Sequence, residues 1–129
     1  MDAAQALADL TEISSQIQAA VLFDESGAVQ GSTLGDEEAA GALAAAASRL
    51  LAEVDELAGD GAAVTQLEAA TDDGSVFVVR DGARRIAATT APAPTVGLVF
   101  YDLKSCLRDV AEEPAKPKRT RRKKADDEA

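Results

Sequence analysis

The sequence predicts a three-layer domain of the α/β (α+β) class, in which helices enclose a five-stranded, mostly antiparallel sheet. Three segments have apolar residues at the helical period, and five short segments between them resemble strands joined mostly by tight, glycine-containing turns. One strand, residues 76–79, is apolar at every position, which indicates helices on both faces of the sheet. The predicted order is α-β-β-α-β-β-β-α, with one helix on one face and two on the other.

The first helix is predicted over residues 3–18, because apolar residues recur there at spacings of three and four. These residues are Leu7, Leu10, Ile13 and Ile17. Two strands follow, at residues 19–23 and 28–33, with Gly27 in the turn between them. This part of the chain therefore predicts a hairpin that directly follows a helix.

An alanine-rich helix from Asp36 to Leu57 separates the two groups of strands. Asp36 suits the N-cap, and Glu37 and Glu38 occupy the first turn, where the helix dipole favours negative charge. A projection at about 100° per residue gathers the larger apolar side chains on one face, which is predicted to cover the sheet. That face contains Leu43, Leu50, Leu51, Val54 and Leu57, with Ala39, Ala40 and Ala47 among them.

The far side of this helix has a stripe of small residues at spacings of four, three and four: Gly41, Ala45, Ser48 and Ala52. Small side chains let two helix backbones approach closely, so the stripe predicts a dimer or partner interface. Alanine is also a strong helix former, and the same pattern arises in a helix without a partner. Arg49, beside the stripe, either contacts an acidic or phosphate-bearing partner or balances Glu53 as a solvated pair, and the second interpretation is favoured.

The second half of the chain predicts three strands, at residues 62–70, 76–79 and 85–90, followed by a helix over residues 96–110. The strand at residues 62–70, with Val64 and Gln66, is the candidate for an exposed sheet edge. Bare edges are liabilities unless they are paired. This edge either pairs with another chain or is protected by Glu68 and by strand twist, and pairing is favoured.

Charge divides the chain into two parts, although its overall net charge is −10. Residues 1–113 contain 6 Lys and Arg against 20 Asp and Glu, a net of −14, and are predicted to form the domain. Residues 114–129 contain 7 basic and 3 acidic groups, a net of +4, and are predicted to be a disordered basic tail. The basic residues of the tail are Lys116, Lys118, Arg119, Arg121, Arg122, Lys123 and Lys124.

Composition argues against most catalytic chemistry, because the chain has no histidine and one cysteine, Cys106. An internal disulfide and Ser-His or Cys-His nucleophile pairs are excluded, and a His/Cys metal site nearly so. We therefore expect no enzyme, no metal and no cofactor. No apolar run is long enough to span a membrane, and the N-terminus has an acid where a signal peptide has Lys or Arg, which predicts a cytoplasmic protein.

Two blocks of sequence resemble the roadblock/dynein light-chain family. One is AAVLFDESGAVQGST with the acidic start and small-residue body of the middle helix; the other is GSVFVVRDGARRIAATTAPAPTVGLVFYDL, with Gly97 just inside the last helix. The resemblance covers about residues 3–112. It departs from the family at residues 16–18, which lack the Pro-Gly often found there.

The resemblance implies a homodimer or heterodimer in which two sheets join edge to edge and the middle helices lie side by side. It further implies an adaptor or regulator of a Ras-like small GTPase, or a light chain of a motor complex, and bacterial members are often paired with a small GTPase. The leading hypothesis is thus a non-enzymatic dimeric regulator of a small GTPase or its signalling complex. The alternative is a dimeric tether whose basic tail binds nucleic acid or anionic membrane, although no aromatic residues interleave its charges.

Overall fold

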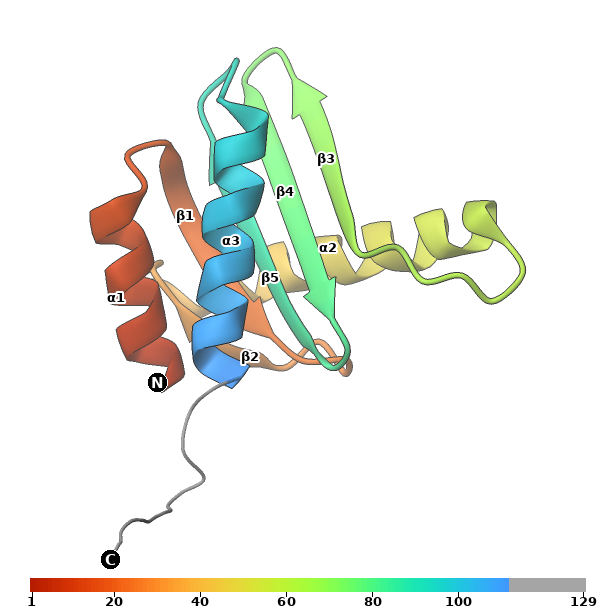
Figure 1. Cartoon of the computed structure of the whole chain (residues 1–129), viewed down its shortest axis with the longest axis horizontal. Coiled ribbons are helices and arrows are strands. Elements are labelled where there is room, and N and C mark those ends of the chain that lie inside the picture. The colour runs from red at the N-terminus through yellow and green to blue at the C-terminus, as the bar shows by residue number, and fades with distance from the viewer. Residues whose placement is uncertain (112–129) are drawn as a thin grey trace, which may run out of the picture.

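The computed structural model describes residues 1–111, which form three helices and one five-stranded sheet (Figure 1). The elements are α1 (Ala3–Ile13), β1 (Ile17–Phe23), β2 (Val29–Ser32), α2 (Glu37–Ala58), β3 (Gln66–Thr71), β4 (Gly74–Asp81), β5 (Arg84–Thr90) and α3 (Val96–Ala111). The spatial order of the strands is β2-β1-β5-β4-β3, and every neighbouring pair is antiparallel. The predicted fold class and element order are confirmed.

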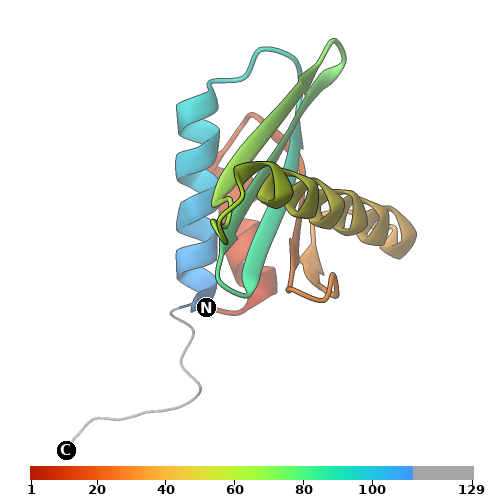
Figure 2. The same cartoon turned by 90° about the vertical axis from the view of Figure 1, so that its right-hand side faces the viewer.

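Helices cover the two faces of the sheet unequally. Figure 2 shows α1 and α3 together on one side of the sheet and α2 alone on the other. Strand β3 is the last strand at its end of the sheet, and the C-terminal half of α2 extends past it (Figure 1). The central strands β1, β5 and β4 therefore lie between two helical layers, as the continuously apolar residues 76–79 predicted.

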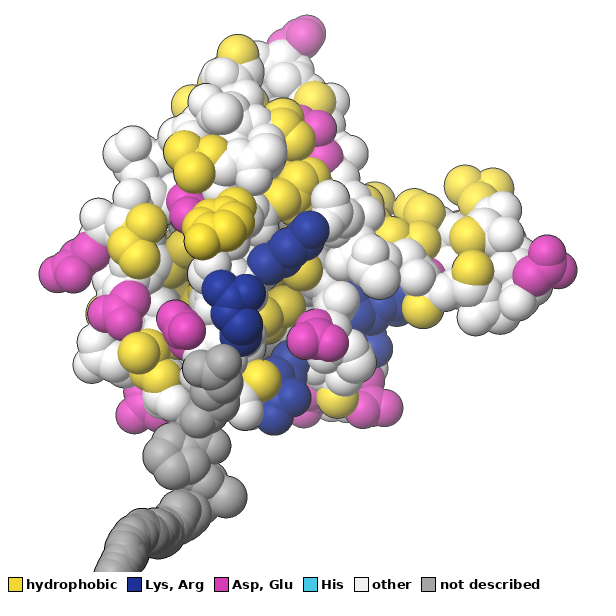
Figure 3. Space-filling view, in the orientation of Figure 1, with side chains coloured by type: hydrophobic (Ala, Val, Ile, Leu, Met, Phe, Trp, Pro, Cys, Tyr) yellow, Lys and Arg dark blue, Asp and Glu magenta, His cyan; other side chains and the backbone are white. Residues whose placement is uncertain are grey.

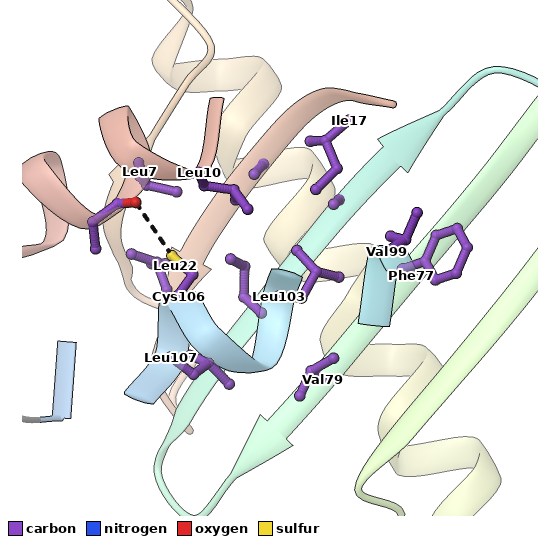
Figure 4. Packing of buried hydrophobic residues seen from close by; sticks show 14 residues of the cluster. Leu7, Leu10, Ile17, Leu22, Phe77, Val79, Val99, Leu103, Cys106 and Leu107 are labelled. Atoms are coloured by element: carbon purple, nitrogen blue, oxygen red, sulfur yellow. Dashed lines mark hydrogen bonds between the residues drawn. The ribbon is translucent and has the colours of Figure 1, made fainter. Parts of the chain in front are cut away.

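The face beneath α1 and α3 is a closed hydrophobic core built from large side chains (Figure 4). Leu7 and Leu10 of α1 meet Leu103 and Leu107 of α3 above the sheet, and all four side chains are buried. At the other side of α3 the rings of Phe77 and Phe100 pack edge to face, with centroids 5.0 Å apart. Such aromatic pairs add to the stabilisation that burial already gives. The sheet surface on this side is thereby covered, while Ile13 of α1 and Leu98 and Tyr101 of α3 remain exposed.

The face beneath α2 is packed mainly by alanine. The buried residues of this helix are Ala40, Ala44, Ala47 and Leu51, which lie over Val21, Phe23, Val78 and Ala87 of the sheet. The prediction that the larger apolar side chains would cover the sheet was wrong for Leu57, which is 86% exposed, and only partly right for Leu43, Leu50 and Val54, which are half-buried. Small side chains let the helix approach the sheet closely, and the leucines are displaced to one flank.

Two element boundaries differ from the prediction. Helix α1 ends at Ile13, where Ser14 takes an extended conformation, and Ile17 pairs with Thr90 in the sheet instead of completing the helix. Strand β3 begins at Gln66, not at residue 62. Val64, just before the strand, instead forms hydrogen bonds with Asp55 of α2 and Arg80 of β4, which are described below.

Candidate assembly surface on the middle helix and edge strand

Helix α2 is fixed at both ends by the residues that the sequence suggested. The Asp36 side chain accepts a hydrogen bond from the backbone N–H of Glu38, 3.0 Å away, and so caps the first turn. Gly59 ends the helix with φ of 69°, a conformation that glycine adopts without strain. Both ends of the helix are therefore capped, including the end that extends beyond the sheet.

One flank of α2 carries leucines spaced seven residues apart: Leu43, Leu50 and Leu57. We call these three residues the leucine flank. Their exposure rises along the helix, from half-buried at Leu43 and Leu50 to 86% at Leu57. An apolar seam with a seven-residue repeat is typical of a helix that packs against another helix. This spacing was present in the sequence, but the projection assigned the same leucines to the sheet.

The predicted stripe of small residues lies on the opposite flank. Ala45 and Ala52 are exposed, and Gly41 is half-buried with open space around the position of a Cβ. Ser48 differs, because its hydroxyl is buried against the chain's own β1–β2 turn: a Cβ at Gly27 would lie 3.8 Å from Ser48 Oγ. Three members of the stripe thus face outward, while Ser48 contacts the same domain.

Arg49 is exposed and forms no ion pair within residues 1–111. Its predicted pairing with Glu53 is therefore absent from the described part of the chain. Val64 is half-buried and packs against the alanine-rich core beneath α2, whereas Gln66 is the first residue of the edge strand. Of the two residues predicted on the edge strand, Gln66 therefore lies on β3 and Val64 lies just before it.

An ion pair that the sequence did not reveal fixes the end of α2 relative to the edge strand. Arg80 of β4 donates two hydrogen bonds to the Asp55 carboxylate, at 2.6 and 3.0 Å, and its Nε donates to the Val64 carbonyl at 2.8 Å. The backbone N–H of Val64 donates to Asp55 at 2.8 Å. These bonds from Arg80 and Val64 hold the pKa of Asp55 below its ordinary value of 3.8, against a smaller opposing effect of burial.

This cluster also shows which way α2 faces. Asp55 and Ser48 lie seven residues apart on one flank, and both contact the end of the sheet where the β1–β2 and β4–β5 turns lie. The leucine flank therefore faces the other half of the sheet. There Leu67 and Val76, on the α2 side, are only partly buried at the border of the core. The leucine flank and this half of the sheet form one incompletely covered apolar surface.

The bare edge of the sheet adjoins that surface. Strand β3 pairs with β4 on one side, from Gln66 opposite Val79 to Thr71 opposite Gly74, and has no strand on its other side within residues 1–111. An unpaired row of backbone donors and acceptors is a template for another strand. The arrangement suits assembly, because an open edge and an open apolar flank meet on the same side of the domain.

Residues 1–111 contain neither grouped metal ligands nor an exposed thiol. No group of three or more His, Cys, Asp or Glu residues within residues 1–111 is placed to hold a metal ion. Cys106 is buried between α1 and α3 with its Sγ 3.6 Å from the Ala6 carbonyl (Figure 4), and burial raises the pKa of its thiol to about 12. Such a thiol is protonated at neutral pH and fits a structural role. No helix among these residues is long and apolar enough to cross a membrane.

The basic tail lies outside the described residues. The predicted boundary after residue 113 and the seven tail bases from Lys116 to Lys124 therefore stay predictions. The described part of the chain ends at Ala111, the last residue of α3.

This three-layer domain, with its bare edge strand and projecting middle helix, has the Roadblock/LC7 fold. The structure is similar to the Roadblock/LC7 domain of Streptomyces avermitilis, with a TM-score of 0.76 and 22% identity over 86% of this chain and 96% of that one. It is also similar to the gliding protein MglB of Thermus thermophilus, with a TM-score of 0.69 and 14% identity over 84% and 85% of the two chains. A further MglB structure, described as a tetrameric arrangement, aligns with a TM-score of 0.65 and 15% identity over the same shares.

No family model matches this sequence, and no curated protein matches it either. The likeness to the solved structures therefore establishes the fold. The predicted roadblock resemblance is confirmed at that level.

Proposed function

We propose that this chain is a non-enzymatic, dimeric adaptor or regulator of a Ras-like small GTPase or of a signalling complex that contains one. The observation that carries the proposal is the unfinished surface formed by the leucine flank and the bare β3 edge. The Roadblock/LC7 fold and the MglB neighbours support it at low identity. A cytoplasmic location is part of the proposal.

A second copy of the chain fits this surface under two-fold symmetry. A two-fold axis perpendicular to the sheet at the β3 edge pairs the two β3 strands and keeps both α2 helices on the same side. Because α2 extends past β3 (Figure 1), each helix then covers part of the other sheet. The incoming helix meets Leu43, Leu50 and Leu57, and it covers the half of the sheet that includes Val76. The sequence predicted that the two helices would meet at the small-residue stripe. In this arrangement they meet at the leucine flank instead.

The small-residue stripe keeps a separate role in this arrangement. Gly41, Ala45 and Ala52 lie on the flank opposite the leucines, so the proposed dimer leaves them accessible. Two such stripes, one from each copy, are therefore available for a third protein. Because Arg49 is exposed beside the stripe, it is the base best placed to contact an acidic partner there.

Two double variants separate the dimer contact from partner docking. Leu50→Asp with Leu57→Asp introduces charge into the leucine flank, and we expect a monomer that remains folded, because both positions are partly or largely exposed. Ala45→Glu with Ala52→Arg alters only the opposite flank without changing the net charge, and we expect an intact dimer that loses the small GTPase. For the leucine variant, sedimentation measures whether the chain is a monomer, and far-ultraviolet circular dichroism measures whether it remains folded.

The GTPase arm uses the full chain as bait in native extract, with the wild type and both double variants side by side. Small GTPases recovered with the wild type are purified, and their GTP hydrolysis and nucleotide release are measured with and without this chain. The proposal predicts binding that is lost in the Ala45/Ala52 variant and a change in one of the two rates. A monomeric wild type would contradict the proposal. So would a dimer that binds purified small GTPases equally with and without the Ala45/Ala52 changes.

A further inference from the structure

The bases of the folded domain are concentrated at one end of the molecule. Five of the six Lys and Arg residues among residues 1–113 lie on the end of β4, the start of β5 and the C-terminal half of α3: Arg80, Arg84, Arg85, Lys104 and Arg108. Figure 3 shows Lys and Arg side chains gathered over this part of α3 and the β4–β5 turn. In a domain with 20 acidic residues, bases scattered over the surface would each have acidic neighbours. Their concentration at one end is therefore unexpected.

Most of these cations have no acidic partner in the described structure. Arg80 and Asp55 form the one ion pair within residues 1–111. Lys104 and Arg108 are exposed one turn apart on α3, and Arg108 donates a hydrogen bond to Ser105 Oγ at 3.1 Å. The nearby Asp81 lies opposite Arg84 in the sheet, so the local balance remains positive.

Lys104 and Arg108 stand over a hollow of about 350 Å³ between α3 and the edge strand. Its lining combines a buried apolar floor, Val79 and Leu107, with polar and charged groups, which are Thr65, Gln66, Arg80, Asp81, Lys104 and Arg108. Gln66 belongs to β3, so the hollow opens beside the bare edge of the sheet. A carboxylate that entered along this edge would meet Lys104 and Arg108 against the single acid Asp81, because Arg80 is already paired with Asp55. In such a partly enclosed site charge-assisted hydrogen bonds are stronger than in water.

The edge strand itself carries one carboxylate, Glu68, and the register of two paired β3 strands decides where it lies. In a two-fold antiparallel pair, directly opposite residues share a face of the sheet. A register centred on Glu68 places two like charges opposite each other, which is destabilising. A register centred on Leu67 instead places Leu67 opposite Leu67 of the copy on the α2 face, where it adds apolar contact to the leucine flank.

The register centred on Leu67 also places Gln66 opposite Glu68 of the copy. Gln66 and Glu68 lie opposite Val79 and Phe77 of β4, whose side chains face α3, so they share the face on which the hollow opens. Directly opposite residues have Cβ atoms roughly 5 Å apart. The Glu68 carboxylate of one copy thereby reaches the hollow of the other.

We infer that the hollow is a docking site for Glu68 of a second copy, which pairs with Lys104 and Arg108 across a β3 interface centred on Leu67. The inference rests on the proposed dimer and specifies its register and its charge pairs. Because of the two-fold symmetry, the pairing of Glu68 with Lys104 and Arg108 forms at two sites in the dimer. The contact selects a copy of the same chain over a related roadblock chain that lacks this combination of charges.

Charge exchange tests the pairing. Glu68→Lys alone, or Lys104→Glu with Arg108→Glu, replaces attraction by repulsion at both symmetric sites, and we expect each to raise the dimer Kd by at least about tenfold at low salt. An equimolar mixture of these two variants should form a heterodimer, because the ammonium group introduced by Glu68→Lys then faces the two introduced acids while the native pair forms at the other site. The triple variant should recover self-association to within about threefold of the wild type.

The control is Glu12→Lys, which makes the same charge change as Glu68→Lys at an exposed position of α1 and should leave the dimer Kd unchanged. Sedimentation of the full chain over a range of concentrations and salt gives each Kd. Failure of the mixture to associate more tightly than either variant alone overturns the pairing. A wild-type chain that never dimerises contradicts the proposed function instead, so the two failures are distinct.

A cysteine cross-link tests the register independently, in a Cys106→Ala background. Leu67→Cys should form a disulfide between copies under mild oxidation, because the two side chains lie directly opposite each other. Ala69→Cys should cross-link far more slowly, since its opposite residue would be Thr65. Preferential cross-linking at residue 69 would overturn the inference. So would anionic vesicles or a DNA duplex that bound through Lys104 and Arg108 in competition with self-association.

Discussion

The two faces of the sheet are built by different rules. On one face, α1 and α3 bury Leu7, Leu103 and Phe77 completely or nearly so. On the other, α2 alone packs through Ala40, Ala44 and Ala47 and leaves larger apolar side chains partly or fully exposed on its flank. Both faces have an apolar sheet surface to cover, but only the first has enough helix to cover it.

The difference separates stability from assembly. A closed core of large side chains stabilises the single chain, since each such side chain contributes a substantial transfer free energy. A face packed by alanine contributes less, and its displaced leucines become available to a second chain. We therefore expect substitutions on the first face to alter unfolding and substitutions on the leucine flank to alter association.

The largest difference should appear on truncation of one leucine from each side. Leu103→Ala removes a fully buried side chain and should lower the free energy of unfolding by about 2–5 kcal/mol. Leu57→Ala, at 86% exposure, should change the unfolding of the dissociated chain by roughly 0.5 kcal/mol or less. Urea unfolding at a protein concentration below the dimer Kd gives both values. Equal losses would remove the distinction between the faces.

A smaller loss is expected from an enlarged side chain beneath α2. Ala44 is completely buried where the helix approaches the sheet, so Ala44→Leu should cost about 1–3 kcal/mol through overpacking. Ala45 is the neighbouring residue and is exposed, which makes Ala45→Leu the matched control with little expected change. Thermal unfolding of the two variants compares them. A tolerated leucine at position 44 would mean that α2 is not held close to the sheet.

The Asp55–Arg80 pair should make the α2 side sensitive to acid. Hydrogen bonds from Arg80 and Val64 lower the folded-state pKa of Asp55 below 3.8, so the pair stabilises the fold above that value and is lost as the pH falls through the lowered pKa. Asp55→Asn should therefore lose less stability than the wild type between about pH 5 and pH 2.

Arg80→Met is the companion variant, because it removes the Arg80 guanidinium that donates hydrogen bonds to the Asp55 carboxylate. In an Arg80→Met background, Asp55→Asn should have a smaller effect on the acid dependence. Urea unfolding at several pH values measures this coupling. Identical acid profiles for the wild type and Asp55→Asn would show that the pair does not stabilise the end of α2.

The smallest effect concerns Cys106 on the closed face. Burial raises its thiol pKa to about 12, so little thiolate exists at neutral pH and access is blocked. Alkylation by iodoacetamide should be slow in the native protein and should become fast in urea. Rapid modification of the folded chain would indicate that α1 and α3 separate readily.

The order and type of the elements were predictable because local signals determine them. Glycines in turns, the Asp36 cap and the apolar period of each helix are readable without knowledge of distant contacts. The orientation of α2 was not predicted correctly, since a projection ranks side chains by hydrophobicity and does not include how closely a helix approaches its sheet. The seven-residue spacing of Leu43, Leu50 and Leu57 was the available signal for a second helix.

The contacts that position the candidate site were less accessible to sequence reasoning. Asp55 and Arg80 are separated by 25 residues, and each alone resembles a solvated surface charge. The start of β3 depends on the same pair, because Arg80 and Asp55 hold Val64 outside the strand. Only the folded chain brings these groups together.

The central claim is that the leucine flank of α2 is completed by a second copy while the closed face is not. Isotope-filtered nuclear Overhauser spectroscopy on a mixture of labelled and unlabelled full chain measures this directly. We expect contacts between copies at the methyl groups of Leu50 and Leu57, and none at Leu103 or Leu107. A chain that stays monomeric, or one whose contacts between copies lie on α1 and α3, would contradict the account.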